Sequence, residues 1–272
     1  MTSKNKWLSA PYLFWSAVFI IIPLGMVLYY GLTDRTGAFT IDNIMAITSA
    51  GHAKSLRLAL LLSFISTIVC FLLAYPLAMI LANMKVKRHN FIILIFILPM
   101  WMNFLLRTLA WQTLLEKNGV INHILSFLHL PALKIINTPA AIILGMVYNF
   151  LPFMVLPLYN ALAKIDTNVI NAARDLGASY FYTFIRIILP LSVPGIISGI
   201  TMVFIPALTT FVISSLLGGG KLLLIGDVIE QEFTRTSNWH LGSGLSMVLM
   251  IFILINMVLS AIFDKEGEGS ML

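Results

Sequence analysis

Between Arg57 and Lys85 the chain reads Leu58-Ala-Leu-Leu-Leu-Ser-Phe-Ile-Ser-Thr-Ile-Val-Cys-Phe-Leu-Leu-Ala-Tyr-Pro-Leu-Ala-Met-Ile-Leu-Ala-Asn-Met84, without one charged side chain. An α-helix rises about 1.5 Å per residue, so about 20 mostly apolar residues cross the hydrocarbon core of a bilayer. Residues 58–84 exceed that length. The stretch therefore predicts a transmembrane helix and defines the pattern to look for elsewhere.

Stretches of the same kind recur along the chain and together predict six transmembrane helices, because backbone in lipid must satisfy its own hydrogen bonds. Their ranges are 7–33, 58–84, 89–106, 135–163, 187–220 and 236–263. The first is longer than the apolar core of a cleaved signal peptide, so we expect it to be retained. The sequence predicts an all-α polytopic membrane protein, with a transmembrane domain over 11–263 and tails at 1–10 and 264–272.

The composition excludes a soluble enzyme. Hydrophobic residues make up 59% of the chain and charged residues 10%, against about a quarter charged in soluble domains. A disordered chain is excluded for the same reason. The histidines show no metal-ligand spacing, and residues 218–221 fail the phosphate-loop pattern because Ser215 and Leu222 replace its first glycine and its hydroxyl residue. We expect no catalytic, metal or nucleotide site, and no nucleic-acid partner.

The distribution of Lys and Arg sets the orientation, because cytoplasmic loops carry an excess of both. With the N-terminus inside, the cytoplasmic segments hold nine of these residues and the outer segments seven. Three of the nine, Lys85, Lys87 and Arg88, crowd into one short loop, where the rule is strongest. The sequence therefore predicts that both termini are cytoplasmic.

A shorter apolar segment, residues 120–130, separates the third and fourth predicted spans. Its apolar residues share one helical face, while Asn122, His123, Ser126 and His129 lie on the other. The segment is too short to cross a bilayer. It predicts a helix that lies at the membrane interface or caps the protein.

The predicted inner loop 161–190 contains two short helical patterns. Asp166 or Thr167 can cap the first helix, and Gly177 can close it in a left-handed conformation. The apolar residues of this first helix share one face, formed by Val169, Ile170, Ala173 and Leu176. The second helix is stopped by Pro190 and Pro194. An amphipathic helix on the cytoplasmic side requires a protein groove or the membrane surface, so the loop predicts a docking element.

The same loop resembles a known motif. Ala172-Ala173, Gly177, then nine residues and Ile187-x-Leu189-Pro190 resemble the E-A-A-x3-G-x9-I-x-L-P coupling loop of binding-protein-dependent ABC importer permeases. Asn171 departs from the motif's glutamate. The resemblance implies that the loop sits in a cleft of a separate ATPase and transmits its closure to the membrane helices. The implied coupling residues are Asn171, Ala172, Ala173, Asp175, Gly177, Ile187, Leu189 and Pro190.

Further blocks resemble the PotB-type permeases of spermidine/putrescine importers. They read Leu98-Pro-Met-Trp-Met-Asn-Phe-Leu-Leu-Arg107, Leu151-Pro-Phe-Met-Val-Leu-Pro-Leu-Tyr159, Ala172-Ala-Arg-Asp-Leu-Gly-Ala-Ser179, Thr183-Phe-Ile-Arg-Ile-Ile-Leu-Pro190 and Leu224-Ile-Gly-Asp-Val-Ile229. The resemblance implies a type I ABC importer permease (MetI-like) fold in the bacterial inner membrane and alternating access driven by ATP.

The implied partners are a PotC-like permease, two PotA-like ATPases that bind ATP and Mg, and an extracytoplasmic PotD-like polyamine-binding protein. No cofactor is expected in this chain. The outer loops 34–54 and 221–235 are expected to receive the loaded binding protein.

A polyamine pathway requires groups that replace water around a cation, such as oxygen dipoles, aromatic faces or carboxylates. No Asp or Glu falls inside the six predicted spans, so we expect the partner permease to supply acids, or aromatic rings and hydroxyls to suffice. Interfacial belts and helix packing would also explain such residues. The candidates are Trp101, Asn103, Trp111, Tyr148, Asn149, Tyr159, Thr209, Thr210, Ser214 and Ser215.

Arg107 leaves an alternative open, because an intramembrane charge is a functional candidate. A cation would repel a polyamine, so we expect Arg107 to reach the outer interface or to pair with Glu116. In a permease for an anion or an amino acid, Arg107 would instead contact the substrate. An ion-gradient-driven transporter predicts membrane-embedded acids and needs no coupling loop, and a purely structural anchor needs no coupling loop either.

Overall fold

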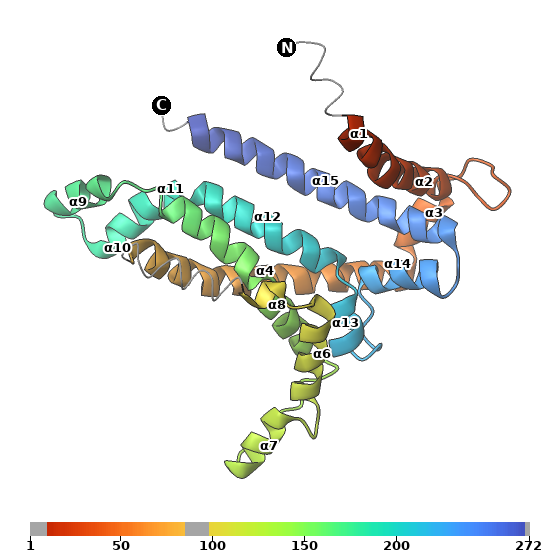
Figure 1. The fold of residues 1–272 in the computed structure, drawn as a ribbon, viewed down its shortest axis with the longest axis horizontal. Coiled ribbons are helices and arrows are strands. Elements are labelled where there is room, and N and C mark those ends of the chain that lie inside the picture. The colour runs from red at the N-terminus through yellow and green to blue at the C-terminus, as the bar shows by residue number, and fades with distance from the viewer. Residues whose placement is uncertain (1–9, 85–97, 270–272) are drawn as a thin grey trace. The chain divides into compact units, whose positions relative to one another are not determined.

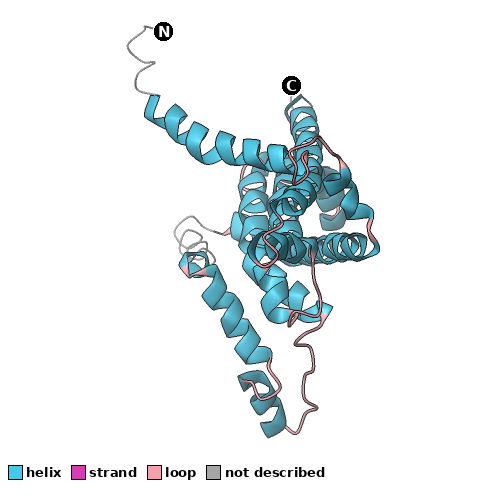
Figure 2. Ribbon diagram, turned by 90° about the vertical axis from the view of Figure 1, so that its right-hand side faces the viewer, coloured by secondary structure: helices cyan, strands magenta, loops and turns pink. Residues whose placement is uncertain are grey.

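The computed structural model describes residues 10–84 and 98–269 (Figure 1). These residues form helices and connecting loops, with one isolated bridge between Thr33 and Phe39 (Figure 2). The predicted all-α class is therefore confirmed. The elements, where η denotes a 3₁₀ or π helix, are α1 (Ala10–Ser16), η2 (Ala17–Ile21), α2 (Ile22–Gly31), α3 (Asp42–Met45), η3 (Ala46–Thr48), α4 (Ala50–Asn83), η4 (Leu98–Trp101), α6 (Phe104–Leu115), α7 (Val120–Phe127), α8 (Pro139–Leu162), α9 (Thr167–Asp175), α10 (Tyr180–Thr183), η5 (Phe184–Ile188), α11 (Leu189–Leu191), α12 (Val193–Thr209), α13 (Val212–Leu217), α14 (Ile225–Thr234) and α15 (Trp239–Gly269).

Four helices in the described part of the chain are long and apolar enough to cross a membrane. They are Pro11–Gly31, Ala50–Asn83, Pro139–Leu162 and Trp239–Val258, and the pair Tyr180–Leu191 and Val193–Thr209 makes a fifth candidate. The predicted count of six is not confirmed. Most of the third predicted span, 89–106, lies outside the described residues, and its described end is η4 followed by α6.

The fifth predicted span, 187–220, is interrupted at two places in the structure. The chain bends by 63° between Tyr180–Leu191 and Val193–Thr209, where Pro190 and Pro194 remove backbone donors. A second break follows α12, because Thr210 adopts an extended conformation with φ −65° and ψ 140°. The adjacent β-branched Thr209 and Thr210 lower the local helix propensity.

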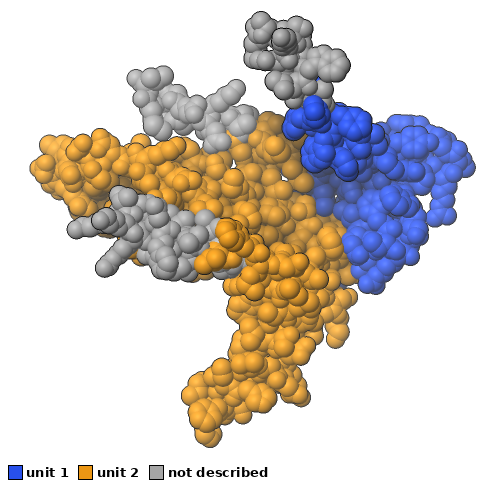
Figure 3. Space-filling view, viewed as in Figure 1, with its two compact units in different colours: residues 1–56, 228–252 blue, residues 57–227, 253–272 orange. Residues whose placement is uncertain are grey.

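The described chain forms two compact units (Figure 3). The first holds residues 1–56 and 228–252, and the second holds residues 57–227 and 253–272. In the second unit, α8 packs along α12 through glycines. A Cβ atom on Gly195 would lie 2.8 Å from the Pro157 carbonyl oxygen, and one on Gly199 would lie 2.6 Å from the Met154 sulfur. Gly195 and Gly199 therefore form a face on which α8 packs closely.

In the first unit, α2 packs on the start of α15. Gly31 lies against Met247 and Ser243, and Gly244 lies against Asn43. The Nδ1 atom of His240 is 2.7 Å from the Thr33 carbonyl oxygen. Because a carbonyl oxygen only accepts, Nδ1 carries the proton of this imidazole. The close approach and the hydrogen bond join helices that are far apart in the sequence.

The predicted helix at 120–130 forms as α7, but one residue of its expected polar face is turned inward. Asn122 is buried, donates to the carbonyl oxygens of Glu116 and Leu133, and accepts from the Leu133 amide. It therefore fastens the loops on both sides of α7. The short helix exposes Val120, Ile124 and Phe127 instead. Asn122 is turned inward because two loop carbonyl groups and one loop amide offer it three hydrogen bonds.

Candidate functional site

The predicted docking element forms a capped helix, α9. The Asp166 carboxylate accepts a hydrogen bond of 2.9 Å from the Asn168 amide, so Asp166 is the N-cap. At the other end Gly177 has φ +86°. Its amide donates to the Arg174 carbonyl oxygen, and the Ala178 amide donates to the Ala173 carbonyl oxygen. These two bonds form a Schellman motif, which confirms the left-handed closure at Gly177.

The surface of α9 is uncovered in this chain. Leu176 is 90% exposed and Val169 is 46% exposed. Asn171, Ala172, Asp175 and Gly177 are exposed too, whereas Ala173 is half-buried. No atom lies within 4 Å of the position that a Gly177 Cβ would take. An apolar face this open fits contact with another surface.

The helices after Gly177 connect α9 to the interior of the second unit, where Figure 1 shows α9 and α10 at one end. The Arg174 guanidinium lies 5.8 Å from the Tyr180 ring centroid, and the Ser179 hydroxyl caps α10 by accepting from the Tyr182 amide. Three more predicted coupling residues follow along the same path, with Ile187 in η5 and with Leu189 and Pro190 in α11.

The bend between α11 and α12 is held by a buried contact that sequence reasoning did not find. The Tyr75 hydroxyl on α4 lies 2.8 Å from the Ser192 hydroxyl at the bend. The Tyr75 ring also meets the Phe184 ring edge to face, at 5.8 Å between centroids. The only sequence signal is a tyrosine beside Pro76 within an apolar helix.

Four predicted pathway residues near α6 lie in three environments: an exposed position, a helix cap and an aromatic pair. Trp101 is 78% exposed, and Asn103 caps α6 by accepting from the Leu105 and Leu106 amides. Trp111 and Tyr148 form an edge-to-face pair at 5.2 Å, in a surface depression that Val69, Ala140, Ile143, Leu144, Val147 and Leu151 complete. The structure thus pairs Trp111 with Tyr148.

Asn149 is the most enclosed of the predicted pathway residues on α8. It is 1% exposed, and its side-chain amide donates to the Gly145 carbonyl oxygen at 2.9 Å. Its Oδ1 atom has no hydrogen-bond partner among the described residues. Tyr159 lies further along α8 and is half-exposed.

The predicted pathway residues of the fifth span gather at the break between α12 and α13. The Thr209 hydroxyl donates to the Ile205 carbonyl oxygen, and the Ser214 hydroxyl donates to the Phe211 carbonyl oxygen. Thr210 is buried at the break, whereas Ser215 is exposed. α13 then packs against α6 and α8, which carry the other candidates.

Two charged residues, Arg107 and Asp227, are buried among the described residues. Arg107 is 8% exposed, and its guanidinium carbon lies 6.0 Å from the Phe104 ring centroid. Its Nε atom has no hydrogen-bond partner among the described residues. Asp227 is 1% exposed. The apolar neighbours Leu224 and Ile225 were the available signal.

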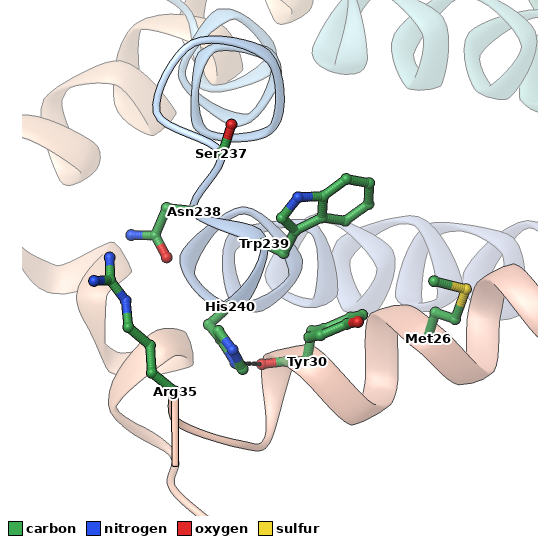
Figure 4. Close-up of a pocket in the computed structure, with 7 residues that line it drawn as sticks. All are labelled: Met26, Tyr30, Arg35, Ser237, Asn238, Trp239 and His240. Atoms are coloured by element: carbon green, nitrogen blue, oxygen red, sulfur yellow. Dashed lines mark hydrogen bonds between the residues drawn. The ribbon is translucent and has the colours of Figure 1, made fainter. Parts of the chain in front are cut away.

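The first unit holds a second cavity, of about 450 Å³, at the start of α15 (Figure 4). Its lining residues are Met26, Tyr30, Arg35, Ser237, Asn238, Trp239 and His240. Arg35 belongs to the predicted outer loop 34–54. In the same loop, a hydrogen bond from the Thr36 hydroxyl lowers the pKa of Asp34. The other lining residues fall within the predicted spans 7–33 and 236–263.

The family described as "Binding-protein-dependent transport system inner membrane component" matches residues 44–265. This chain belongs to that family. Two curated relatives are named "Spermidine/putrescine transport system permease protein PotB". The one from Haemophilus influenzae is 39% identical, with 88% of each chain covered. The one from Escherichia coli K12 is 36% identical, with 93% of this chain and 97% of the relative covered.

Solved structures show that this permease shares its fold with ABC importers. A crystal structure of a bacterial ABC transporter involved in the import of the acidic polysaccharide alginate has a TM-score of 0.79 at 18% identity, covering 97% of this chain and 96% of that one. The MetNI methionine ABC transporter has a TM-score of 0.56 at 18% identity, covering 79% and 95%. The predicted MetI-like importer permease fold is confirmed.

Proposed function

We propose that this inner-membrane permease moves polyamines, spermidine or putrescine, into the cytoplasm by alternating access. The observation that carries the proposal is the identity of 36–39%, over about nine tenths of the chain, with two permeases named for spermidine/putrescine transport. The buried oxygen atoms and paired rings of the second unit support it, since both can replace water around an ammonium group.

The proposed complex contains a PotC-like permease, two PotA-like ATPases and a PotD-like binding protein. ATP and Mg bind the ATPases, and this chain holds no cofactor and catalyses no covalent step. In the proposed orientation both termini are cytoplasmic. The loops 34–54 and 221–235 then face the binding protein, and 161–190 faces the ATPase.

We propose that α9 docks into a cleft of the ATPase. The exposed Leu176 supplies an apolar anchor at its end, and the Schellman motif at Gly177 fixes how the chain leaves it. Movement of α9 passes through α10 and η5 to the bend at Ser192. The coupling residues that follow Gly177 act in this proposal by shaping that connection, with Pro190 at the bend.

We propose that the pathway runs along the surfaces of α6, α8, α12 and α13. The ring pair Trp111 and Tyr148 offers aromatic faces, and Asn149 offers a buried amide oxygen. Thr209, Thr210 and Ser214 contribute hydroxyl and carbonyl oxygens at the α12–α13 break. Trp101, Tyr159 and Ser215 complete the proposed lining from more exposed positions, and Asn103 positions the start of α6.

The deciding experiment is uptake of labelled spermidine and putrescine into polyamine-depleted cells that express the importer with or without this chain. Uptake that requires the chain and ATP, and that persists when the ion gradient is dissipated, is the expected result. An assembled complex that takes up neither polyamine would contradict the substrate assignment. Uptake lost with the gradient would instead indicate a secondary transporter.

A second candidate function rests on Arg107. A buried guanidinium, 8% exposed, would suit an anionic substrate better than a cation. The substitution Arg107→Gln separates the two functions. If Arg107 is structural, the Arg107→Gln complex is expected to retain polyamine uptake. The second candidate would be favoured if the unaltered complex takes up an anion or amino acid but no polyamine, and if Arg107→Gln loses that uptake.

A further inference from the structure

The cavity of about 450 Å³ in the first unit lies where two candidate membrane spans have their ends (Figure 4). The span Pro11–Gly31 ends there, and the span Trp239–Val258 begins there. Tyr30 and Trp239 both line the cavity, with their ring centroids 6.2 Å apart. Tyrosine and tryptophan are enriched at the level of the lipid headgroups. The cavity therefore lies at the boundary between the hydrocarbon core and the headgroups.

The lining changes from polar to apolar along the cavity. Arg35 and Asn238 extend toward one end in Figure 4, and Met26 lies toward the other. Met26 precedes Tyr30 on α2 by about one helical turn, which places it about 6 Å further into the span. A cavity graded in this way suits an amphiphile, with its polar head at Arg35 and a hydrocarbon chain at Met26.

The charge of the lining favours an anionic head. Arg35 is exposed, and none of the described lining residues is acidic. The adjacent Asp34 serves its own loop, because its Oδ1 atom accepts hydrogen bonds from the Thr36 amide and hydroxyl and from the Ala38 amide. A guanidinium group presents several donors to one phosphate group. The amide group of Asn238 adds a donor on the same wall.

The wall of the cavity is held in place by hydrogen bonds of its own. The His240 Nδ1 atom donates to the Thr33 carbonyl oxygen at 2.7 Å and lies 3.1 Å from that of Tyr30. The Asn43 side chain also donates to the Thr33 carbonyl oxygen, at 2.9 Å. Ser237 has φ +53°, a conformation that is uncommon for a residue other than glycine and that recurs at ligand sites. A preformed site loses less conformational entropy when its ligand binds.

The surface beyond the cavity can receive a hydrocarbon chain. The apolar part of the span Pro11–Gly31 is uncovered in this chain, and Met26 is 44% exposed. A chain that leaves the cavity at Met26 would continue along α2 into the hydrocarbon core. The cavity and the helix surface therefore form one continuous contact for a lipid.

We propose that this cavity binds a phospholipid with an anionic headgroup. The phosphate group contacts Arg35 and Asn238, and one acyl chain extends past Met26 along α2. The bound lipid contacts both α2 and the start of α15, so it holds these two helices together at the membrane surface. The proposal does not depend on which solute the permease transports.

The test counts lipids that the purified importer complex retains in native mass spectrometry as dioctanoyl phosphatidylglycerol is added. Arg35→Gln is expected to need about ten times more of this lipid to fill one site, because charge-assisted hydrogen bonds are lost. Arg235→Gln removes the same charge from an exposed position of the first unit outside the lining. This control should bind the lipid as the unaltered complex does.

A second pair of variants tests the acyl chain. Met26→Ser should weaken phosphatidylglycerol binding, because apolar contact is lost. Leu24→Ser, at an exposed leucine of the same helix outside the lining, is the matched control. Glycerol 3-phosphate carries the phosphate group without acyl chains, so it should fail to displace the lipid at equal concentration.

The unaltered complex supplies a test that needs no variant. It should retain phosphatidylglycerol in preference to dioctanoyl phosphatidylcholine, whose headgroup has no net charge. Equal retention of the two lipids would overturn the proposal, as would equal affinities of the Arg35→Gln and Arg235→Gln complexes. Displacement by glycerol 3-phosphate would overturn it in favour of a free anion. Loss of the extracytoplasmic binding protein from Arg35→Gln, with lipid retention unchanged, would overturn it in favour of a protein interface.

Discussion

The hydroxyl of Tyr75 lies 2.8 Å from the hydroxyl of Ser192, and 117 positions in the sequence separate the two residues. Both side chains are buried. Ser192 sits at the 63° bend that joins the helices after α9 to α12. The contact therefore ties α4 to the point where movement of the proposed coupling helices would enter the membrane-spanning part of the chain.

Removing the Tyr75 hydroxyl should weaken this connection. Tyr75→Phe keeps the ring contact with Phe184 and loses one buried hydrogen bond, at a cost of about 1 kcal/mol in the free energy of unfolding. We expect assembly to survive and the spermidine taken up per ATP hydrolysed to fall. Tyr12→Phe, at an exposed tyrosine, is the matched control. An unchanged transport ratio in Tyr75→Phe would show that the bond only stabilises the fold.

The left-handed Gly177 should be indispensable for coupling. Its φ of +86° costs an alanine about 1 kcal/mol, and proline cannot adopt it. We expect Gly177→Ala to reduce substrate-stimulated ATP hydrolysis and Gly177→Pro to abolish it. Gly25→Ala, at a helical glycine with open space around it, should have no effect. Full stimulated hydrolysis in an assembled Gly177→Pro complex would refute the coupling assignment.

Leu176 should anchor the ATPase. A leucine that is 90% exposed on the end of α9 makes few contacts within its own chain, so Leu176→Ser should leave the permease folded. We expect the affinity for the ATPase to fall about tenfold, as for an interface anchor. Leu128→Ser, at an exposed leucine beside α7, is the control. Equal ATPase recovery with both variants in a pull-down would argue against docking at α9.

The α8–α12 contact should not tolerate a larger side chain. A Cβ atom on Gly195 would lie 2.8 Å from the Pro157 carbonyl oxygen, and backbone cannot move aside as a flexible side chain can. Gly195→Ala should cost about 1–3 kcal/mol through overpacking. The thermal unfolding midpoint of the purified permease should fall accordingly, whereas Gly25→Ala should leave it unchanged. Equal midpoints would mean that the helices separate readily at this point.

Local features of this protein could be read from the sequence. The absence of charge over 58–84 predicted the long α4. A charge-free stretch of that length is favourable in the hydrocarbon core of a bilayer, where a helix satisfies the backbone hydrogen bonds. Asp166 and Gly177 predicted the ends of α9, because a cap depends on residues within one turn of each other.

Features that depend on distant contacts could not be read in this way. Pro190 and Pro194 indicated the interruption near Ser192, but the apolar composition of the fifth predicted span gave no signal for the break at Thr210. Asn122 belongs to a polar helical face, yet it is buried, because the carbonyl groups of Glu116 and Leu133 accept hydrogen bonds from its side chain.

The sequence by itself determined the membrane location, the helical class and the caps of α9, since length without charge and short-range hydrogen bonding decide these. Only the tertiary structure decided that Tyr75 meets Ser192, that the turn at Gly226 closes on Thr209 and Thr210, and that Asp227 is buried. Those outcomes follow from packing between segments far apart in the chain, where the free energy of an ion or a hydroxyl depends on neighbours that no local pattern specifies.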